Sequence, residues 1–150
     1  MSREWKPNVT VAAVVERDGR FLVVEEETSE GLRINQPAGH LEAGESLVDA
    51  VRRETFEETA HRFEPDALVG IYQWRRPQDD VTYLRFTFSG VVGEAVPGAR
   101  LDTGIVRALW LTADELRECA QRHRSPLVLR SLEDWLGGRR ASLELIGEGR

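Results

Sequence analysis

Apolar and polar positions along the chain predict strands in five short segments. These segments are rich in β-branched and aromatic residues, and several alternate between apolar and polar positions, as strands do. The predicted strands are Val9–Glu16, Phe21–Glu26, Leu68–Arg75, Val81–Val92 and Ala108–Leu111. Asp18-Gly19 is a strong hairpin signal, so the first two strands should pair antiparallel. We also predict a last edge strand at Ser142–Ile146.

Three other segments carry apolar residues at helical spacing. The predicted helices run from Leu47 to about Thr59, from Thr112 to about Gln121, and from Pro126 to the Gly137-Gly138 stop. Ser46 is the expected N-cap of the first helix, a capping box opens the second, and Ser125 caps the third. This mixed order of strands and helices is compatible with an α/β fold in a single domain spanning residues 1–150.

The apolar stripe of the first predicted helix turns acidic in its last two turns. At roughly 100° per residue, Glu54 and Glu58 fall in the same sector as Ala50 and Val51. Two carboxylates about 4 Å apart repel by roughly 4 kcal/mol at an effective dielectric of about 20, so a partly buried group needs compensation. Mg²⁺ or Mn²⁺ would supply it, because both prefer oxygen ligands. The alternative is a solvated helix end on which Glu and Arg form i,i+4 pairs.

Charge and cysteine content limit the remaining possibilities. The 150 residues carry a net charge of −6, which argues against binding to a nucleic-acid polymer or an anionic membrane. Charged residues interrupt the N-terminal segment, and the mainly apolar run Val9–Val15 is far shorter than the ~20 residues that cross a bilayer. Cys119 is the only cysteine, and we interpret it as structural. We expect a cytoplasmic protein that is a monomer or a weak homodimer.

The acidic helix lies within a longer motif. The chain resembles the Nudix box, G-x5-E-x7-R-E-U-x-E-E-x-G-U, at Gly39, Glu45, Arg53, Glu54, Glu57 and Glu58. Three positions depart from the family pattern. Thr55 stands where the family prefers an aliphatic residue, Ala60 replaces the last glycine, and His61 replaces the last apolar residue. Because glycine is absent from the C-cap, we expect the helix to end less sharply than in the family.

The resemblance implies a fold and a metal-dependent activity. The fold would be a mixed β-sheet sandwiched between helices, and the activity would be hydrolysis of a nucleoside diphosphate linked to another group. Glu54, Glu57 and Glu58 would bind Mg²⁺, with Mn²⁺ as a substitute. One of these carboxylates, most often at the Glu54 position, would also orient the attacking water.

Other residues take supporting roles by the same resemblance. Arg53 would hold a catalytic carboxylate in place, and Glu45 would fix the preceding loop onto the helix. A backbone carbonyl at Ala38 or Gly39 would complete the shell of a metal ion. Family members often carry an extra acidic residue in the glycine-rich loop before the last strand, where Asp102 is our candidate metal ligand.

Segments outside the box resemble one subgroup of the family, the NudJ-type phosphatases. They are VAAVVERDGRFLVVEE, NQPAGHLEAGESLVDA, YQWRRP, YLRFTF, RSPLV and SLELIGE. Members of that subgroup release orthophosphate from nucleoside tri- and diphosphates and hydrolyse hydroxymethylpyrimidine diphosphate and thiamine diphosphate. The alternatives are a Nudix pyrophosphohydrolase for another nucleotide and a Nudix-fold module that binds without catalysis. An isopentenyl diphosphate isomerase requires a catalytic cysteine, and Cys119 is far from the box.

Three residues are candidates for contacts with a small di- or triphosphate substrate. The planar guanidinium of Arg85 suits a phosphate if its strand face forms the cleft, and otherwise it is an exposed or paired charge. Trp74 suits stacking on a substrate ring. Gln36 either contacts substrate or stabilises a turn. We interpret the acidic run Glu25–Glu27 as solvated or edge-protecting charge, with the alternative that one of the three points into the site. We interpret His123 as a surface residue, with the alternative that the basic cluster Arg122–Arg124 touches a phosphate.

Overall fold

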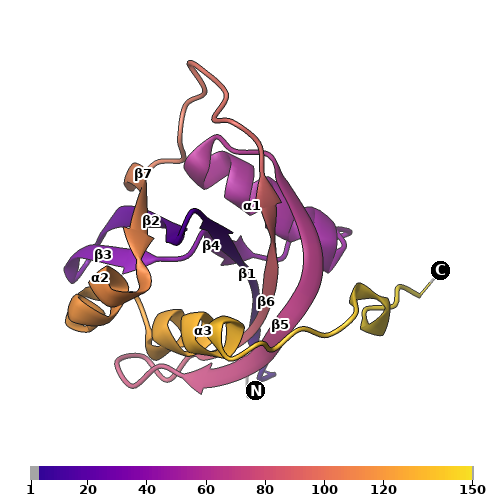
Figure 1. Cartoon of the computed structure of the whole chain (residues 1–150). Coiled ribbons are helices and arrows are strands. Elements are labelled where there is room, and N and C mark those ends of the chain that lie inside the picture. The colour runs from indigo at the N-terminus through magenta and orange to yellow at the C-terminus, as the bar shows by residue number, and fades with distance from the viewer. Residues whose placement is uncertain (1–3, 150) are drawn as a thin grey trace.

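The computed structural model describes residues 4–149 (Figure 1). In chain order they form β1 (Asn8–Arg17), β2 (Arg20–Thr28), β3 (Gly31–Asn35), β4 (Ala38–His40), α1 (Leu47–Thr59), β5 (Phe63–Arg75), β6 (Thr82–Val92), β7 (Ile105–Thr112), α2 (Ala113–Glu118), η1 (Ala120–Arg122), α3 (Pro126–Leu136) and η2 (Leu143–Leu145). The bounds of α1 are those predicted. Its N-cap is also confirmed, because Ser46 Oγ accepts a hydrogen bond from the Asp49 N–H at 3.0 Å.

The two halves of the sheet meet at β1. This strand pairs in parallel with β6 and antiparallel with β4, and β5 pairs antiparallel with β6, so the sheet is mixed. β1 and β2 form the predicted antiparallel hairpin, but they pair only at Glu16↔Phe21 and Arg17↔Arg20. Beyond these rungs β2 turns away to pair with β3 and β7. The strand order is therefore β3-β2-β1-β6-β5, with β4 attached to β1 and β7 to β2.

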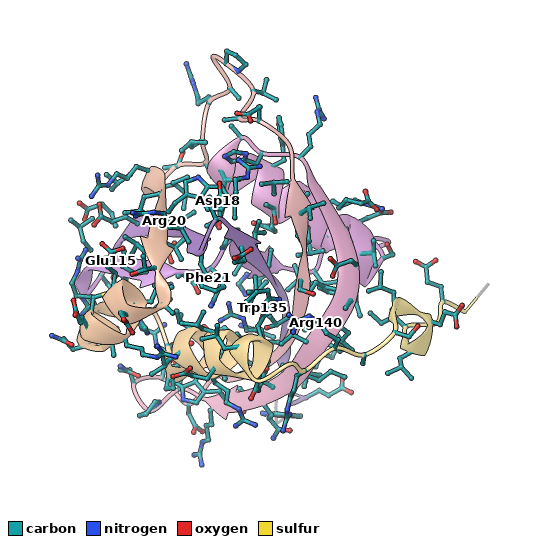
Figure 2. The ribbon with its side chains drawn as sticks, viewed as in Figure 1. Asp18, Arg20, Phe21, Glu115, Trp135 and Arg140 are labelled. Atoms are coloured by element: carbon teal, nitrogen blue, oxygen red, sulfur yellow. The ribbon has the colours of Figure 1, made fainter. Side chains whose placement is uncertain are left out.

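Residues that alternate along the central strands serve two cores, one on each face of the sheet. Val11 and Val15 face α1, whose Ala50 is fully buried in the same cluster. The second core comprises Val14, Phe21, Val23, Ile34, Leu116 and Leu132, from β1, β2, β3, α2 and α3. In it the Phe21 ring meets Trp135 edge-on, with centroids 5.3 Å apart (Figure 2). Helices therefore cover both faces of the mixed sheet, which confirms the predicted α/β architecture.

Polar contacts fix α3 on the sheet. The hydroxyls of Ser131 on α3 and Thr87 on β6 lie 3.2 Å apart and are buried. Tyr72 of β5 donates its hydroxyl to Asp134 Oδ2 at 2.7 Å. These contacts hold the middle and the C-terminal part of α3 against β5 and β6.

The predicted edge strand Ser142–Ile146 is wrong. Ala141 exchanges two backbone hydrogen bonds with Leu68 of β5, at 2.8 and 2.9 Å. The chain then curls into a 3-10 turn, because Ser142 Oγ accepts a hydrogen bond from the Glu144 N–H at 3.1 Å.

Other strand and helix limits also differ from the prediction. β5 begins at Phe63 instead of Leu68, because the earlier residues continue the ladder with the end of β6 across two register shifts. β7 is longer than predicted, and β3 and β4 were not predicted. α2 ends at Glu118, and a 3-10 turn follows as far as Arg122. Among residues 4–149, no helix has both the length and the apolar character needed to cross a membrane.

The expectation of a loose end for α1 is also wrong. Ala60 itself takes the left-handed conformation, with φ of 63°, and its N–H donates to the Phe56 carbonyl at 2.8 Å. The buried His61 follows, with its Nδ1 donating to the Gly93 carbonyl at 2.7 Å and its ring edge-on to Trp110. A left-handed C-cap therefore forms without glycine, at the steric cost that a Cβ brings to this conformation.

Candidate active site

The last two turns of α1 present three glutamates that differ in burial. Glu58 is buried, with 9% of its surface exposed, whereas the side chains of Glu54 and Glu57 are 12% and 32% exposed. Glu54 and Glu58 lie in the sector of α1 that also carries the core residue Val51, and this sector faces the sheet. The helical period therefore places two carboxylates where apolar side chains would normally be buried.

Arg53 is the cation at the centre of this group. Its Nη1 donates to Glu54 Oε1 at 2.7 Å and to Glu57 Oε1 at 2.9 Å. Its Nε and Nη2 donate to the two oxygens of Glu45 at 2.6 and 3.0 Å, and Nη2 also donates to the His40 carbonyl. The hydrogen bonds from Arg53 hold the pKa of Glu45 below its ordinary value. Arg53 thus ties the preceding loop to α1 and contacts two of the three glutamates.

Glu58 forms no ion pair with any basic side chain in the part of the chain that the structure describes. Its Oε1 accepts a hydrogen bond from the Ala38 N–H at 3.0 Å. Burial raises the pKa of Glu58 to about 8, and the negative charges of Glu54, Glu26 and Asp102 act in the same direction. Burial also raises the pKa of Glu54. A bound cation would therefore offset the cost of ionising these two buried carboxyl groups.

Gly39 allows the Glu54 carboxylate to lie against the backbone of β4. A Cβ at position 39 would come within 2.0 Å of Glu54 Cδ. β4 is held in place by its pairing with β1, in which Gly39 lies opposite Val11. The backbone at Ala38 and Gly39 consequently borders the buried carboxylates, and the glycine of the motif has a steric explanation.

The donor set fits a hard divalent cation. Carboxylate and backbone carbonyl oxygens are the ligands that Mg²⁺ and Mn²⁺ prefer. In the conformation shown, no three Asp, Glu, His or Cys side chains within residues 4–149 are already grouped as ligands. Arg53 explains why the Glu54 and Glu57 carboxylates are not grouped around a common point, because its guanidinium binds an oxygen of each. Cation binding at this site would require those oxygens to turn away from the guanidinium.

A cavity of about 480 Å³ adjoins the carboxylates. Its wall consists of Thr10, Glu26, Asn35, Ala38, Gly39, His40, Glu42, Glu54, Glu58, Trp74, Arg76, Tyr83, Arg85, Arg124, Ser125 and Leu127. Trp74 of β5 and Tyr83 of β6 are cross-strand partners, and their rings stack with centroids 6.0 Å apart and planes inclined by 22°. One cavity therefore combines buried carboxylates, arginines and an aromatic pair.

Comparisons with known proteins agree with this geometry. The NUDIX domain model matches residues 5–132. The chain belongs to the Nudix family. Phosphatase NudJ from Escherichia coli is 42% identical over 144 residues, which cover 96% of this chain and 93% of the relative, and Phosphatase NudJ from Shigella flexneri matches to the same extent. The solved NUDIX hydrolase from Nitrosomonas europaea is 50% identical, with a TM-score of 0.93 over 96% of this chain and 98% of that one. The protein is therefore a Nudix hydrolase with the Nudix fold.

This Nudix hydrolase brings together several of the residues singled out from its sequence. Arg85 and Trp74 line the same cavity as Glu54. Gln36 is buried and is not among the residues that line this cavity, and its Oε1 accepts a hydrogen bond from Arg85 at 2.8 Å. Asp102 is exposed and outside the cavity wall, although its N–H donates to the Glu57 carbonyl at 3.0 Å, which keeps the loop against α1.

The interpretation of the run Glu25–Glu27 as solvated charge is wrong for its first residue. Glu25 is 8% exposed and accepts hydrogen bonds from Arg122 at 2.7 Å and Arg107 at 3.1 Å, and these bonds lower its pKa. Glu26 lines the cavity, whereas Glu27 is exposed as expected. The arginine partners of Glu25 lie more than eighty residues away in the sequence, so the charges of neighbouring residues could not predict these ion pairs.

One cavity residue, Tyr83, was missed, and a second, Arg124, was considered only as part of a basic cluster. Tyr83 shares a strand face with Arg85, so the alternation along β6 already contained the signal for it. Arg124 reaches the cavity from the turn before α3, where the sequence shows only a basic cluster. In that cluster His123 is half-buried and its Nε2 donates to the Leu116 carbonyl at 2.8 Å, so it has a structural role.

Proposed function

We propose that this Nudix hydrolase catalyses the Mg²⁺-dependent hydrolysis of a phosphoanhydride bond in small di- and triphosphate compounds, with Mn²⁺ as a substitute ion. One observation carries the proposal. The carboxylate of Glu58 and the guanidinium of Arg85 line one cavity, and neither forms an ion pair within residues 4–149. A cation beside the first and a phosphate beside the second would satisfy both groups.

The substrates we propose are nucleoside tri- and diphosphates, hydroxymethylpyrimidine diphosphate and thiamine diphosphate, cleaved with release of orthophosphate. The 42% identity to proteins named Phosphatase NudJ supports a phosphatase activity. The stacked rings of Trp74 and Tyr83 support a substrate with an aromatic ring, because a nucleobase or pyrimidine stacks on such side chains.

Each part of the site has a proposed role. The ligands of the metal ion would be Glu54, Glu57, Glu58, the backbone carbonyl of Ala38 and, as a further candidate, Asp102. When bound, Mg²⁺ screens the polyphosphate and lowers the pKa of a coordinated water, so no covalent nucleophile is required. Glu54 would orient the attacking water, and Arg53 would hold the catalytic carboxylates in place through the hydrogen bonds described above.

A panel assay tests the proposal. Purified protein is incubated with nucleoside tri- and diphosphates, a nucleotide sugar and the two thiamine-related diphosphates, in Mg²⁺, in Mn²⁺ and in EDTA. We expect orthophosphate with the first two ions and no turnover in EDTA. Glu57→Gln should abolish turnover and leave the circular dichroism spectrum unchanged. Full rates in EDTA, or full activity of Glu57→Gln, would refute the proposed role of the carboxylates.

The same assay distinguishes the two alternatives. A pyrophosphohydrolase for another nucleotide would release pyrophosphate or a nucleoside monophosphate instead of orthophosphate. A binding module would take up nucleotide, measured by isothermal titration, without turnover under any metal condition. Release of orthophosphate in Mg²⁺ excludes both.

A further inference from the structure

Arg85 is the buried cation of the cavity. It lies on β6, is 4% exposed, and forms no ion pair with any carboxylate among the described residues. Its Nη2 donates to Gln36 Oε1 at 2.8 Å and, more weakly, to Asn35 Oδ1 at 3.5 Å. Its Nε is buried and has no hydrogen-bond partner in the described structure. A buried guanidinium without an anion is unfavourable for stability, so a functional reason for keeping it is required.

Both ends of the Gln36 amide are already engaged. Oε1 accepts from Arg85, and Nε2 donates to the Val128 carbonyl on α3 at 2.8 Å. Gln36 itself is 3% exposed and does not contribute to the cavity wall. It therefore joins the guanidinium to α3 across 92 residues of sequence. Because a guanidinium is planar, fixing Nη2 also fixes the direction of Nε.

We propose that Gln36 is a positioning residue, which orients the Arg85 guanidinium so that it binds a phosphate group of the substrate. The inference rests on the proposed function. It assigns to Gln36 a role that is distinct from contact with substrate and distinct from the turn stabilisation considered for it from the sequence.

The strand register shows how Arg85 is placed relative to the carboxylate end of the cavity. Ala38, whose N–H holds Glu58, is paired with Ala12 of β1, and Arg85 is paired with Thr10 of the same strand. Two residues along a strand correspond to roughly 7 Å, and β4 and β6 lie roughly 10 Å apart on opposite sides of β1, so the backbones of Ala38 and Arg85 are roughly 12 Å apart. Arg85 therefore suits a phosphate that follows the one held at the carboxylate end of the cavity.

One short segment connects the two ends of the cavity. Gln36 lies two residues before Ala38 and three before Gly39, against which Glu54 packs. The Pro37 carbonyl accepts a hydrogen bond from the Ala13 N–H at 3.0 Å, which fixes this segment to β1. The backbone that positions the carboxylates thus also positions Gln36, and through it the guanidinium.

The test is a double-mutant cycle on the full-length protein. Gln36→Met removes both hydrogen bonds at similar side-chain length, and Arg85→Met removes the guanidinium. Losing the orientation of a charged hydrogen-bond donor should raise KM about tenfold for a substrate identified in the panel assay, with kcat changed less. In the Arg85→Met background, Gln36→Met should raise KM no further, because its partner is gone.

Ser131→Ala is the matched control. It also removes a buried contact between α3 and the sheet, the one to Thr87, but it does not touch Arg85. It should lower the melting temperature about as much as Gln36→Met does and leave KM unchanged. A rise in KM with Ser131→Ala, or an equal rise with Gln36→Met in both backgrounds, would show that α3 docking matters and would overturn the positioning role.

A binding measurement keeps this inference separate from the proposed function. The Arg85 Nε–H should give a resolved signal in a ¹H–¹⁵N spectrum because the group is buried. Inorganic pyrophosphate should shift that signal in the wild-type protein and shift it much less in Gln36→Met. If the panel shows no turnover, the proposed function fails and this titration still decides the inference. An Nε–H signal that does not respond to pyrophosphate overturns it.

Discussion

Replacing Glu58 by glutamine should make the metal-free protein more stable in a strictly pH-dependent way. Burial raises the pKa of Glu58 from 4.5 to about 8, so the folded state holds this proton more tightly than the unfolded chain does. The wild type therefore has its full stability below pH 4.5 and loses stability as the pH rises through about 8. Between pH 5 and pH 8 the loss is at most about 3.5 kcal/mol, at about 1.4 kcal/mol for each unit of pKa shift.

Glutamine is neutral over this range and can still accept the hydrogen bond from the Ala38 N–H. In EDTA, the unfolding free energies of Glu58→Gln and wild type should agree near pH 5 and diverge toward pH 8, where the melting temperature of the variant should be higher by up to roughly 10 °C. Mg²⁺ should stabilise the wild type increasingly at high pH and have no such effect on the variant. Glu144→Gln, which changes an exposed carboxylate, should match the wild type throughout.

Thermal and urea unfolding between pH 5 and pH 8 provide the measurement. The reasoning is refuted if the difference between Glu58→Gln and wild type is the same at every pH, since an ordinary packing effect would behave in that way. It is also refuted if Mg²⁺ stabilises both proteins equally, because the stabilising ion would then bind elsewhere.

Four further substitutions test individual contacts. Gly39→Ala should lower kcat about a hundredfold with little change in melting temperature, because the added Cβ displaces only the flexible end of Glu54. The control for the kinetic assay is Gly93→Ala, where an added Cβ meets nothing within 4 Å. Thr55→Val should raise the unfolding free energy by about 1 kcal/mol in urea titrations, because it removes a buried hydroxyl that has no partner in the described structure. Ala60→Gly should stabilise by about 0.5–1 kcal/mol in the same titrations by relieving the left-handed C-cap, and a loss of stability would contradict this explanation. Trp74→Leu should raise KM for nucleotides about tenfold, whereas Trp5→Leu, at a position 67% exposed outside the cavity, should not.

The features that the sequence predicted well are local in the chain. The bounds of α1 depend on a cap one residue before it and on apolar spacing within it, and the acidic stripe depends on residues four apart. The hairpin between β1 and β2 follows from Asp18-Gly19, which takes positive φ at both residues. These signals lie within a few residues of the elements they specify, so tertiary structure did not override them.

The features that the sequence failed to predict depend on distant partners. β4 is only three residues long and exists as a strand because β1 offers it a partner. The early part of β5 contains Pro65 and is extended because it pairs with the end of β6. Gln36 is a residue type that is common in turns, and the positioning role proposed for it follows only from its contacts with Arg85 and Val128, 49 and 92 residues away. Periodicity and motifs in a single sequence do not predict contacts between residues so far apart in the chain.

We expect this division between local and distant contacts to separate the residues that act in catalysis from those that select the substrate. The carboxylates, Arg53 and Gly39 come from one contiguous motif, so they can be recognised wherever the motif occurs. The opposite wall of the cavity is assembled from β5, β6 and the turn before α3, and its residues are held by contacts such as Gln36 to Val128 and Trp74 to Tyr83. Substitutions in the motif should therefore change kcat for every substrate alike. Substitutions in the assembled wall should change KM by amounts that differ between a nucleotide and a thiamine-related diphosphate, since the two classes place different groups against it.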